Sequence, residues 1–314
     1  MKTICIQGHD IAPGEERLLQ LPVGTLPSGS EININAHVYR STAPGPVVLV
    51  LGGVHGDEIN GVEIVRRLIV EGTFKQLLRG SVIAIPVLNV FGFNHFSREV
   101  PDGKDVNRSF PGHTKGSLAA RVARTLSKEI LPQVDFGVDL HTGGGGNYNY
   151  PQIRYSERDP RARLLAEQFG APLTIAKPMI SRSLRKTASD LGTSIIVYEG
   201  GENLRFDGIS ITKGMAGVRR LLHAQEMLET APLTEPWQRR YVKSRWLRAE
   251  RPGIFLWSKS SGHPVRKGEQ LAVINDPYGL SETPVLAPVD GFIIGHTNAP
   301  VVTLGDALFH IGTA

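Results

Sequence analysis

Continuous apolar segments alternate with amphipathic helical segments over the first two thirds of the chain, and this alternation constrains the fold more than any other feature. The predicted strands are Gly45–Gly53, which is continuously apolar and bounded by Gly and Pro, and the largely apolar segments Gly80–Val90, Phe136–Gly143 and Gly192–Gly201. Segments that are apolar at every position are typical of strands buried on both faces of a parallel sheet. Apolar residues recur at helical spacing between them, in Ile59–Ile69, Ser117–Val134 and Pro160–Gly170.

Strands that alternate with helices predict an α/β fold, here a mostly parallel mixed sheet flanked by helices. In such sheets, ligands bind beyond the carboxyl ends of the strands. Three polar residues stand at or just past the end of a predicted strand, namely His55, His141 and Glu199. We therefore expect a functional site at this edge of the sheet.

The character of the sequence changes near Ala231. The segment APLTEPWQRR (231–240) is typical of a linker, and short apolar stretches with regularly spaced Gly and Pro follow it to the end. No helical period persists, which predicts a small all-β domain. We expect two domains, at residues 1–231 and 232–314.

Composition narrows the class of protein. The 314 residues are 40% hydrophobic and allow a sizeable core. The net charge of +5 is spread along the chain, which does not favour a nucleic-acid groove. A modest positive charge fits an anionic small substrate, and it fits equally well a charge that has no function at all. The single cysteine, Cys5, rules out an intrachain disulfide and fits a reducing compartment. No stretch approaches the about 18–20 apolar residues that span a bilayer, and the start lacks a signal-peptide core, so we expect a cytoplasmic protein without a membrane partner.

His55 and Glu58 stand three positions apart in GGVHGDE, where a predicted strand ends and a predicted helix begins. Side chains at this spacing on a helix face the same side and could bind one ion. Catalytic zinc commonly has three protein ligands, often two His and one Glu, and keeps one position for water. His141, followed by four glycines, is the candidate third ligand. Without a third ligand, an H-x-x-E pair is as compatible with a polar surface loop.

A zinc hydrolase also needs a proton carrier and a group that stabilises developing negative charge. Glu199 ends an apolar strand, a costly place for a carboxylate unless it has a partner or a use. Glu202 is the competing candidate, and a loop or capping role is the alternative for Glu199. The polar stretch 96–112 carries Arg98 and Arg108, whose guanidinium groups suit carboxylates and oxyanions. A solvated loop is the alternative there.

Four motifs, GGVHGDE, DVNRSFPG, DLHTG and VYEGG, occur in the order and approximate spacing of the succinylglutamate desuccinylase/aspartoacylase family, which the chain resembles over about residues 45–205. The resemblance implies a zinc carboxypeptidase-like fold in the first domain and a zinc-dependent deacylase. It further implies that one Zn²⁺ is held by His55, Glu58 and His141.

The same resemblance implies roles for five other residues. Glu199 matches the glutamate that activates the metal-bound water and later protonates the leaving amine. Arg98 resembles the arginine that polarises the scissile carbonyl, although its distance from the Asn-Arg pair differs slightly from that in relatives. Asn107 and Arg108 match the pair that holds the substrate carboxylate. Asp105 falls where carboxypeptidases place an aspartate behind the first histidine, which fixes the imidazole tautomer; a turn residue is the alternative.

The C-terminal segment resembles half of a biotinyl/lipoyl-like β-barrel. Its APVDG hairpin lacks the modifiable lysine of true carrier domains, so we expect no attached cofactor. In deacylases of this family, an extra β domain shields or narrows the mouth of the active site. A fused domain of this kind is similar to that of the branch that includes the N-acetyl-diaminobutyrate deacetylases of ectoine degradation.

The sequence thus predicts a zinc amidohydrolase that removes an acyl group from a small N-acyl amino acid. A zinc carboxypeptidase for short peptides and a non-catalytic metal-binding sensing module are the alternatives. The acyl group and the oligomeric state stay open, and a homo-oligomer is compatible with the sequence. Arg154, Arg182 and Arg185 lie between His141 and Glu199, where a second substrate anchor or a solvent-facing stretch is expected.

Overall fold

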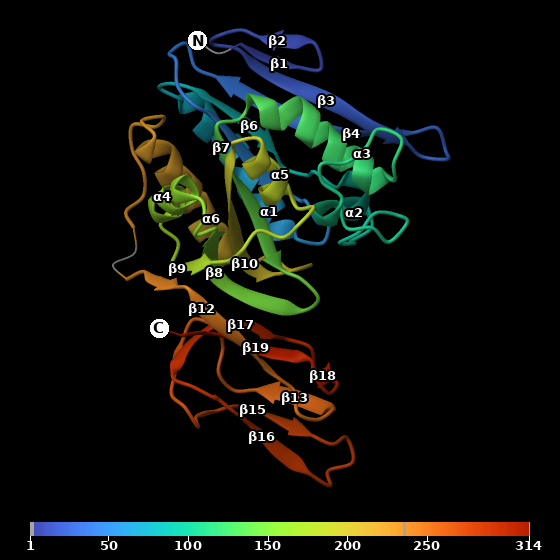
Figure 1. The fold of residues 1–314 in the computed structure, drawn as a ribbon, viewed down its shortest axis with the longest axis vertical. Helices are drawn as coiled ribbons and strands as arrows, with labels where there is room; N and C mark the ends of the chain where they lie inside the picture. The colour runs from blue at the N-terminus through green and yellow to red at the C-terminus, as the bar shows by residue number, and fades with distance from the viewer. Residues whose placement is uncertain (1–2, 235–236, 314) are drawn as a thin grey trace.

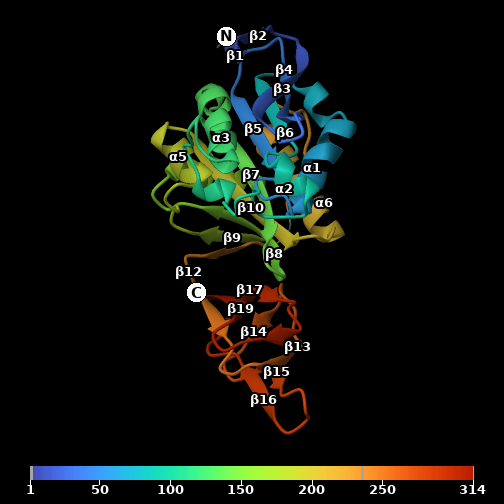
Figure 2. The same ribbon diagram turned by 90° about the vertical axis from the view of Figure 1, so that its right-hand side faces the viewer.

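A computed structural model describes residues 3–234 and 237–313 and is built around one large mixed sheet (Figure 1). Within these residues the main path of the sheet has the strand order β12-β19-β17-β8-β10-β7-β5-β6-β4-β3. Helices cover both faces of its N-terminal part, and the C-terminal strands form a separate lobe at one end (Figures 1 and 2). The predicted fold class, α/β with a C-terminal all-β region, is confirmed.

The centre of the sheet is parallel, as the continuous apolar segments predict. Its strands are β6 (Ser81–Ile85), β5 (Val47–Gly52), β7 (Phe136–Gly143) and β10 (Ser194–Glu202), and each neighbouring pair is parallel. All residues of β5, β6 and β7 are buried. Antiparallel strands flank this centre, with β4 (Glu31–Arg40) and β3 (Glu16–Thr25) at one end and β8 (Asn147–Tyr155) at the other.

Alternate residues of the central strands enter two different hydrophobic cores. In β5, Val48 and Val50 pack with the face that carries α1 (Ile59–Val70), α4 (Pro160–Phe169) and α6 (Gly208–Ala224). Leu49 and Leu51 pack with the face that carries α3 (Leu118–Thr125) and α5 (Leu184–Asp190). Because both faces are covered by helices, neither face of these strands is exposed to solvent, which explains why they are largely apolar.

The helix predicted over Ser117–Val134 is regular only in its first half. After α3, the chain continues through a π-helical turn, Leu126–Ile130, and a 3₁₀ turn, Leu131–Gln133. Pro132 lacks the backbone N–H that would continue an α-helix, which accounts for the irregular end. A further short helix, α2 (Val90–Asn94), follows β6.

The C-terminal strands belong partly to the large sheet and partly to a second one. β12 (Lys243–Arg248), β19 (Ala307–Thr313) and β17 (Gly291–Thr297) extend the large sheet, and β17 pairs antiparallel with β8. The second sheet has the order β16-β15-β13-β18, with bounds Glu282–Leu286, Gln270–Asn275, Gly253–Trp257 and Val301–Val302. Phe255 and Phe309 pack together in a core of this region. The remaining short strands are β1 (Ile4–Ile6), β2 (His9–Ile11), β9 (Leu173–Ala176), β11 (Arg239–Tyr241) and β14 (Pro264–Val265).

The division into domains at residues 231/232 stays a prediction, and positions 235 and 236 of the expected linker lie outside the described residues. Among the residues that the structure describes, no helix has both the length and the apolar character needed to cross a bilayer.

Close packing of α1 on β7 requires a glycine in the helix. A Cβ atom added to Gly61 would lie 2.2 Å from the carbonyl oxygen of Leu140. We expect Gly61→Ala to lower the free energy of unfolding by about 1–3 kcal/mol, because backbone must move to admit the methyl group. Denaturant unfolding measures the change. Gly208→Ala, where an added Cβ meets nothing within 4 Å, is the control and should not destabilise the fold. Equal stability of both variants would contradict this packing.

Candidate metal centre

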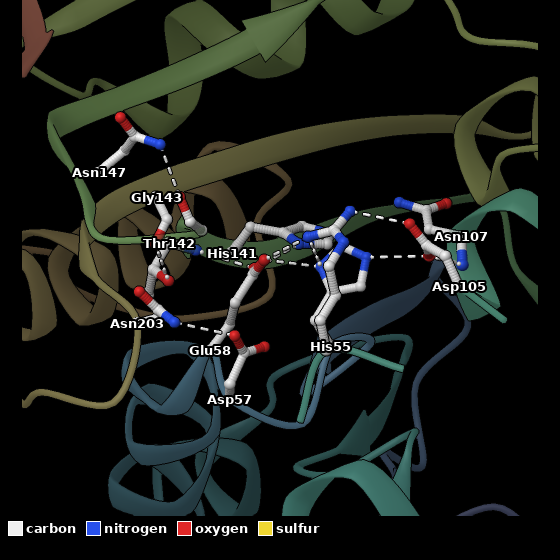
Figure 3. A network of polar contacts seen from close by, with 12 residues as sticks. His55, Asp57, Glu58, Asp105, Asn107, His141, Thr142, Gly143, Asn147 and Asn203 are labelled. Carbon is white, nitrogen blue, oxygen red and sulfur yellow. Dashed lines mark hydrogen bonds and ion pairs between the residues drawn. The ribbon is translucent and has the colours of Figure 1, made fainter. Parts of the chain in front are cut away.

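The structure gathers His55, Glu58 and His141 into one buried cluster (Figure 3). One ligand atom from each residue lies within 4.8 Å of the other two. The Glu58 carboxylate is shared, with Oε1 2.7 Å from His55 Nδ1 and Oε2 2.7 Å from His141 Nδ1. The alternative of a polar surface loop is therefore wrong for this pair, since His55 and Glu58 are 3% and 2% exposed.

Glycines allow the loop between β5 and α1 to present its two polar side chains. Gly53 adopts a left-handed φ of 60° directly after β5, which turns the chain away from the sheet. At Gly56 an added Cβ would lie 1.9 Å from the carbonyl carbon of Gly92, so the backbone of the loop packs against the backbone of α2. Glu58 immediately precedes α1. His141 comes from β7, the strand that pairs with β5.

A carboxylate stands behind each imidazole. Asp105 Oδ1 is 3.2 Å from His55 Nε2, and Asp139 Oδ2 is 2.7 Å from His141 Nε2. Partners of this kind orient the rings and leave the opposite nitrogen, Nδ1, for an ion. The sequence interpretation missed Asp139. Its signal was its position two residues before His141, because alternate residues of a strand share a face.

The charges of the cluster favour the binding of a cation. Burial alone would raise the pKa of Glu58, but the charges of His55 and His141 and their hydrogen bonds outweigh it and hold that pKa well below its usual value. Burial alone would lower the pKa of His141, yet Asp139 and Glu58 raise it well above its usual value. Two nitrogen donors and one carboxylate, buried together, match the ligand set of catalytic zinc. The residues therefore fit the metal that the family resemblance implies.

Arg98 lies beside this cluster. Its Nη1 is 3.1 Å from both Glu58 Oε1 and His55 Nδ1, and its Nη2 donates to Asp105 Oδ2 at 2.9 Å. Burial alone would lower the pKa of Arg98, but Glu58 and Asp105 raise it. The guanidinium group is thus held in place, and the Arg98 side chain is 37% exposed.

Glu199 faces the same side of the sheet as His141. The two residues are register partners on the parallel strands β10 and β7. The Glu199 carboxylate accepts hydrogen bonds from Asn149 Nδ2 at 2.8 Å and from Arg154 Nη1 at 2.7 Å. Glu202, the competing candidate, instead accepts a hydrogen bond from Asn298 at 2.7 Å and does not line the cavity described next.

A cavity of about 300 Å³ joins these groups. Asn107 and Arg108 also line it. Asn107 Oδ1 accepts a hydrogen bond from the backbone N–H of Leu184 at 2.9 Å. Of the three arginines left unassigned, Arg154 and Arg185 line the cavity and Arg182 does not.

Burial, and then the charge of Arg154, lowers the pKa of Arg185 to about 10. Trp246, from β12, lines the cavity as well and stacks on His310 with ring centroids 4.7 Å apart. Sequence reasoning missed Trp246 and Asn149, since nothing local in the sequence shows where β12 docks or which way Asn149 points.

Several known proteins are similar to this chain in sequence and in structure. The chain is 27% identical over 280 residues to the N-alpha-acetyl-L-2,4-diaminobutyric acid deacetylase of Halomonas elongata, a match that covers 84% of this chain and 81% of that protein. The crystal structure of a succinylglutamate desuccinylase/aspartoacylase from Rhodobacter sphaeroides superposes with a TM-score of 0.84 at 26% identity, over 95% and 96% of the two chains.

The product-bound ectoine utilization protein EutE from Ruegeria pomeroyi has the same fold, with a TM-score of 0.84 at 23% identity over 96% of this chain and 95% of that one. The profile of the succinylglutamate desuccinylase/aspartoacylase catalytic domain matches residues 44–225, which is more than half of the chain. The chain therefore belongs to the succinylglutamate desuccinylase/aspartoacylase family.

Proposed function

We propose that this protein is a zinc-dependent amidohydrolase that removes the acyl group from a small N-acyl amino acid. The observation that carries the proposal is the juxtaposition, in one cavity, of a buried His-Glu-His cluster and the carboxylate of Glu199. A relative named as a deacetylase of an N-acetylated amino acid supports the same class of reaction.

His55, Glu58 and His141 would hold the zinc ion. When bound, zinc supplies a Lewis acid that polarises a carbonyl and lowers the pKa of a coordinated water to about 7. Asp105 and Asp139 keep the two imidazoles oriented for that ion through their contacts with the Nε2 atoms.

The remaining residues handle the substrate. Asn107 and Arg108 bind the carboxylate of the amino acid, the side-chain amide of Asn107 donating from its nitrogen because its oxygen is engaged with Leu184. Arg98 donates a hydrogen bond to the scissile carbonyl oxygen and to the oxyanion that forms from it. Glu199 takes a proton from the attacking water and returns it to the departing nitrogen.

The size of the cavity supports a small substrate over a long peptide. The space of about 300 Å³ is bounded on one side by Trp246 from the C-terminal strands. A zinc carboxypeptidase would use the same ligands, and a non-catalytic metal-binding sensor would keep them without turnover. Both alternatives are separated from a deacylase by the assays below.

The charges that line the cavity argue against a basic substrate. Its carboxylates are all engaged: Glu58 with the histidines, Asp139 with His141, and Glu199 with Arg154. Arg185 also lines the cavity, and no carboxylate there is left to pair with a cationic side chain. We therefore propose a neutral or acidic N-acyl amino acid as substrate, unlike the diaminobutyric acid derivative for which the Halomonas elongata relative is named.

Glu199→Gln tests the proton carrier. We expect the variant to bind zinc stoichiometrically by elemental analysis and to lose about 10²–10⁴-fold in kcat, because an amide cannot accept the proton. Glu202→Gln, at the same strand end but outside the cavity, is the matched control and should keep its activity. Turnover of Glu199→Gln at the wild-type rate would show that this role is wrong.

Removal of the metal tests the cluster itself. We expect chelator treatment to abolish hydrolysis and lower the melting temperature, since binding to the folded state alone stabilises it. Added Zn²⁺ should restore both. His141→Ala should lose zinc in elemental analysis, whereas His223→Ala, an exposed histidine on α6, should retain it. Undiminished zinc in His141→Ala would contradict the ligand assignment.

A hydrolysis screen tests the substrate class. We expect N-acetyl, N-formyl or N-succinyl derivatives of neutral or acidic amino acids to be cleaved faster than dipeptides or Nα-acetyl-diaminobutyrate. Arg108→Ala should raise KM by about 10- to 100-fold, the worth of a charge-assisted hydrogen bond. Preference for dipeptides would favour the carboxypeptidase, and zinc binding without any hydrolysis would favour the sensor.

A further inference from the structure

Strand β8 supplies both hydrogen-bond donors to the Glu199 carboxylate. Asn149 Nδ2 donates to Oε2 at 2.8 Å, and Arg154 Nη1 donates to Oε1 at 2.7 Å. Glu199 is only 9% exposed, and a buried carboxylate needs such partners. With one fixed donor on each oxygen, the carboxylate is restrained to one orientation.

A β-bulge brings the two donors to the same side of the sheet. Asn149 and Arg154 are separated by an odd number of positions, so in a regular strand they would point to opposite faces. The register with β10 pairs Gly201 with Asn149 and Glu199 with Gln152, so that two steps along β10 match three along β8. The extra residue reverses the alternation, as bulges beside functional sites do. Pro151 lies in this bulge, a position in a strand that tolerates proline.

The guanidinium group of Arg154 is itself held from behind. Its Nε donates to the side-chain oxygen of Gln152 at 3.4 Å, and Gln152 is fully buried. The Arg154 side chain is 26% exposed in its ion pair with Glu199. Gln152, Arg154 and Glu199 therefore form a chain of contacts that runs from the interior of the sheet to the cavity.

The C-terminal region holds the same strand, β8, in place. β17 pairs with the first half of β8, and Gly295 is the register partner of Asn149. A Cβ atom added at Gly295 would lie 2.9 Å from Asn149 Oδ1 and 2.9 Å from the carbonyl oxygen of Tyr148. The backbone that carries Asn149 is thus set by β17, and the side chain of Asn149 has room only because residue 295 is a glycine.

We infer that Arg154 and Asn149 are positioning residues for Glu199, and that the bulge in β8 turns both side chains toward it. The C-terminal region then contributes to turnover by holding this strand in place. The inference rests on the proposed function, in which Glu199 carries the proton. A base must point at the water it deprotonates, and misplacement by about 1 Å can cost about 10²-fold in rate. Glutamate has a flexible side chain, so its restraint must come from neighbours.

Arg154→Ala is the first test. We expect kcat to fall by about 10- to 100-fold, the usual effect of removing an orienting partner. KM should stay within about threefold of the wild-type value, because binding of substrate is not touched. Zinc content should be unchanged, guanidinium ions added to the assay should restore part of kcat, and Arg154→Lys should keep more activity than Arg154→Ala. The control is Arg219→Ala, which removes a comparably exposed arginine paired with Glu71 on the surface.

Two results for Arg154→Ala would overturn the inference. A rise in KM with unchanged kcat would make Arg154 a substrate-binding residue, and no change in either constant would leave it without a role. Asn149→Ala, expected to show the same fall in kcat at constant KM, supplies an independent test if Arg154→Ala does not fold. Normal turnover of Glu199→Gln would instead refute the proposed function, so the two failures are distinguishable.

Gly295→Ala tests whether the C-terminal region holds β8 in place. We expect a lower kcat at constant KM and constant zinc content, because the new methyl group displaces Asn149. Gly208→Ala is the control, since an added Cβ there meets nothing within 4 Å. An unchanged kcat in Gly295→Ala would refute the part of the inference that concerns β17.

Discussion

The rest of the site depends on the contacts that the Glu58 carboxylate makes with two histidines. This carboxylate contacts His55 and His141 with its two oxygens, and Oε2 also accepts a hydrogen bond from the backbone N–H of Thr142 at 3.1 Å. Removing one partner of a buried charge pair costs about 3–5 kcal/mol, so these contacts fix the β5–α1 loop against β7. Asp105 and Asp139 then set the outer sides of the two imidazoles.

The parallel centre of the sheet explains why these groups meet. β5, β7 and β10 are neighbours that run in one direction, so their carboxyl ends place His55, His141 and Glu199 along one edge. The antiparallel strand β8 closes this edge and brings donors to the Glu199 carboxylate. On its other side, the first half of β8 pairs with β17, which links the same edge to the C-terminal strands. One continuous sheet thus connects the candidate metal centre to a region far away in the sequence.

Sequence reasoning succeeded where a local pattern carries the information. The segment predicted as a strand at Phe136–Gly143 has those bounds as β7, and the fold class follows from the alternation of apolar strands and helices. Asp139 was missed although its strand position relative to His141 offered a signal. Asn149 could not have been found, because the bulge that turns its side chain toward Glu199 exists only in the pairing with β10. Trp246 depends on how β12 docks, which no local pattern encodes.

The sequence by itself determined the type of fold, the family and the residue types available for a metal and a proton carrier, because apolar periodicity and short motifs are local properties. Only the tertiary structure decided that Glu199 rather than Glu202 faces the cavity, and which donors hold it. The physical reason is that strand register and bulges arise from hydrogen bonding between segments distant in the chain. A register shift of one residue would turn the side chains of Glu199 and of its hydrogen-bond donors to the other face of the sheet.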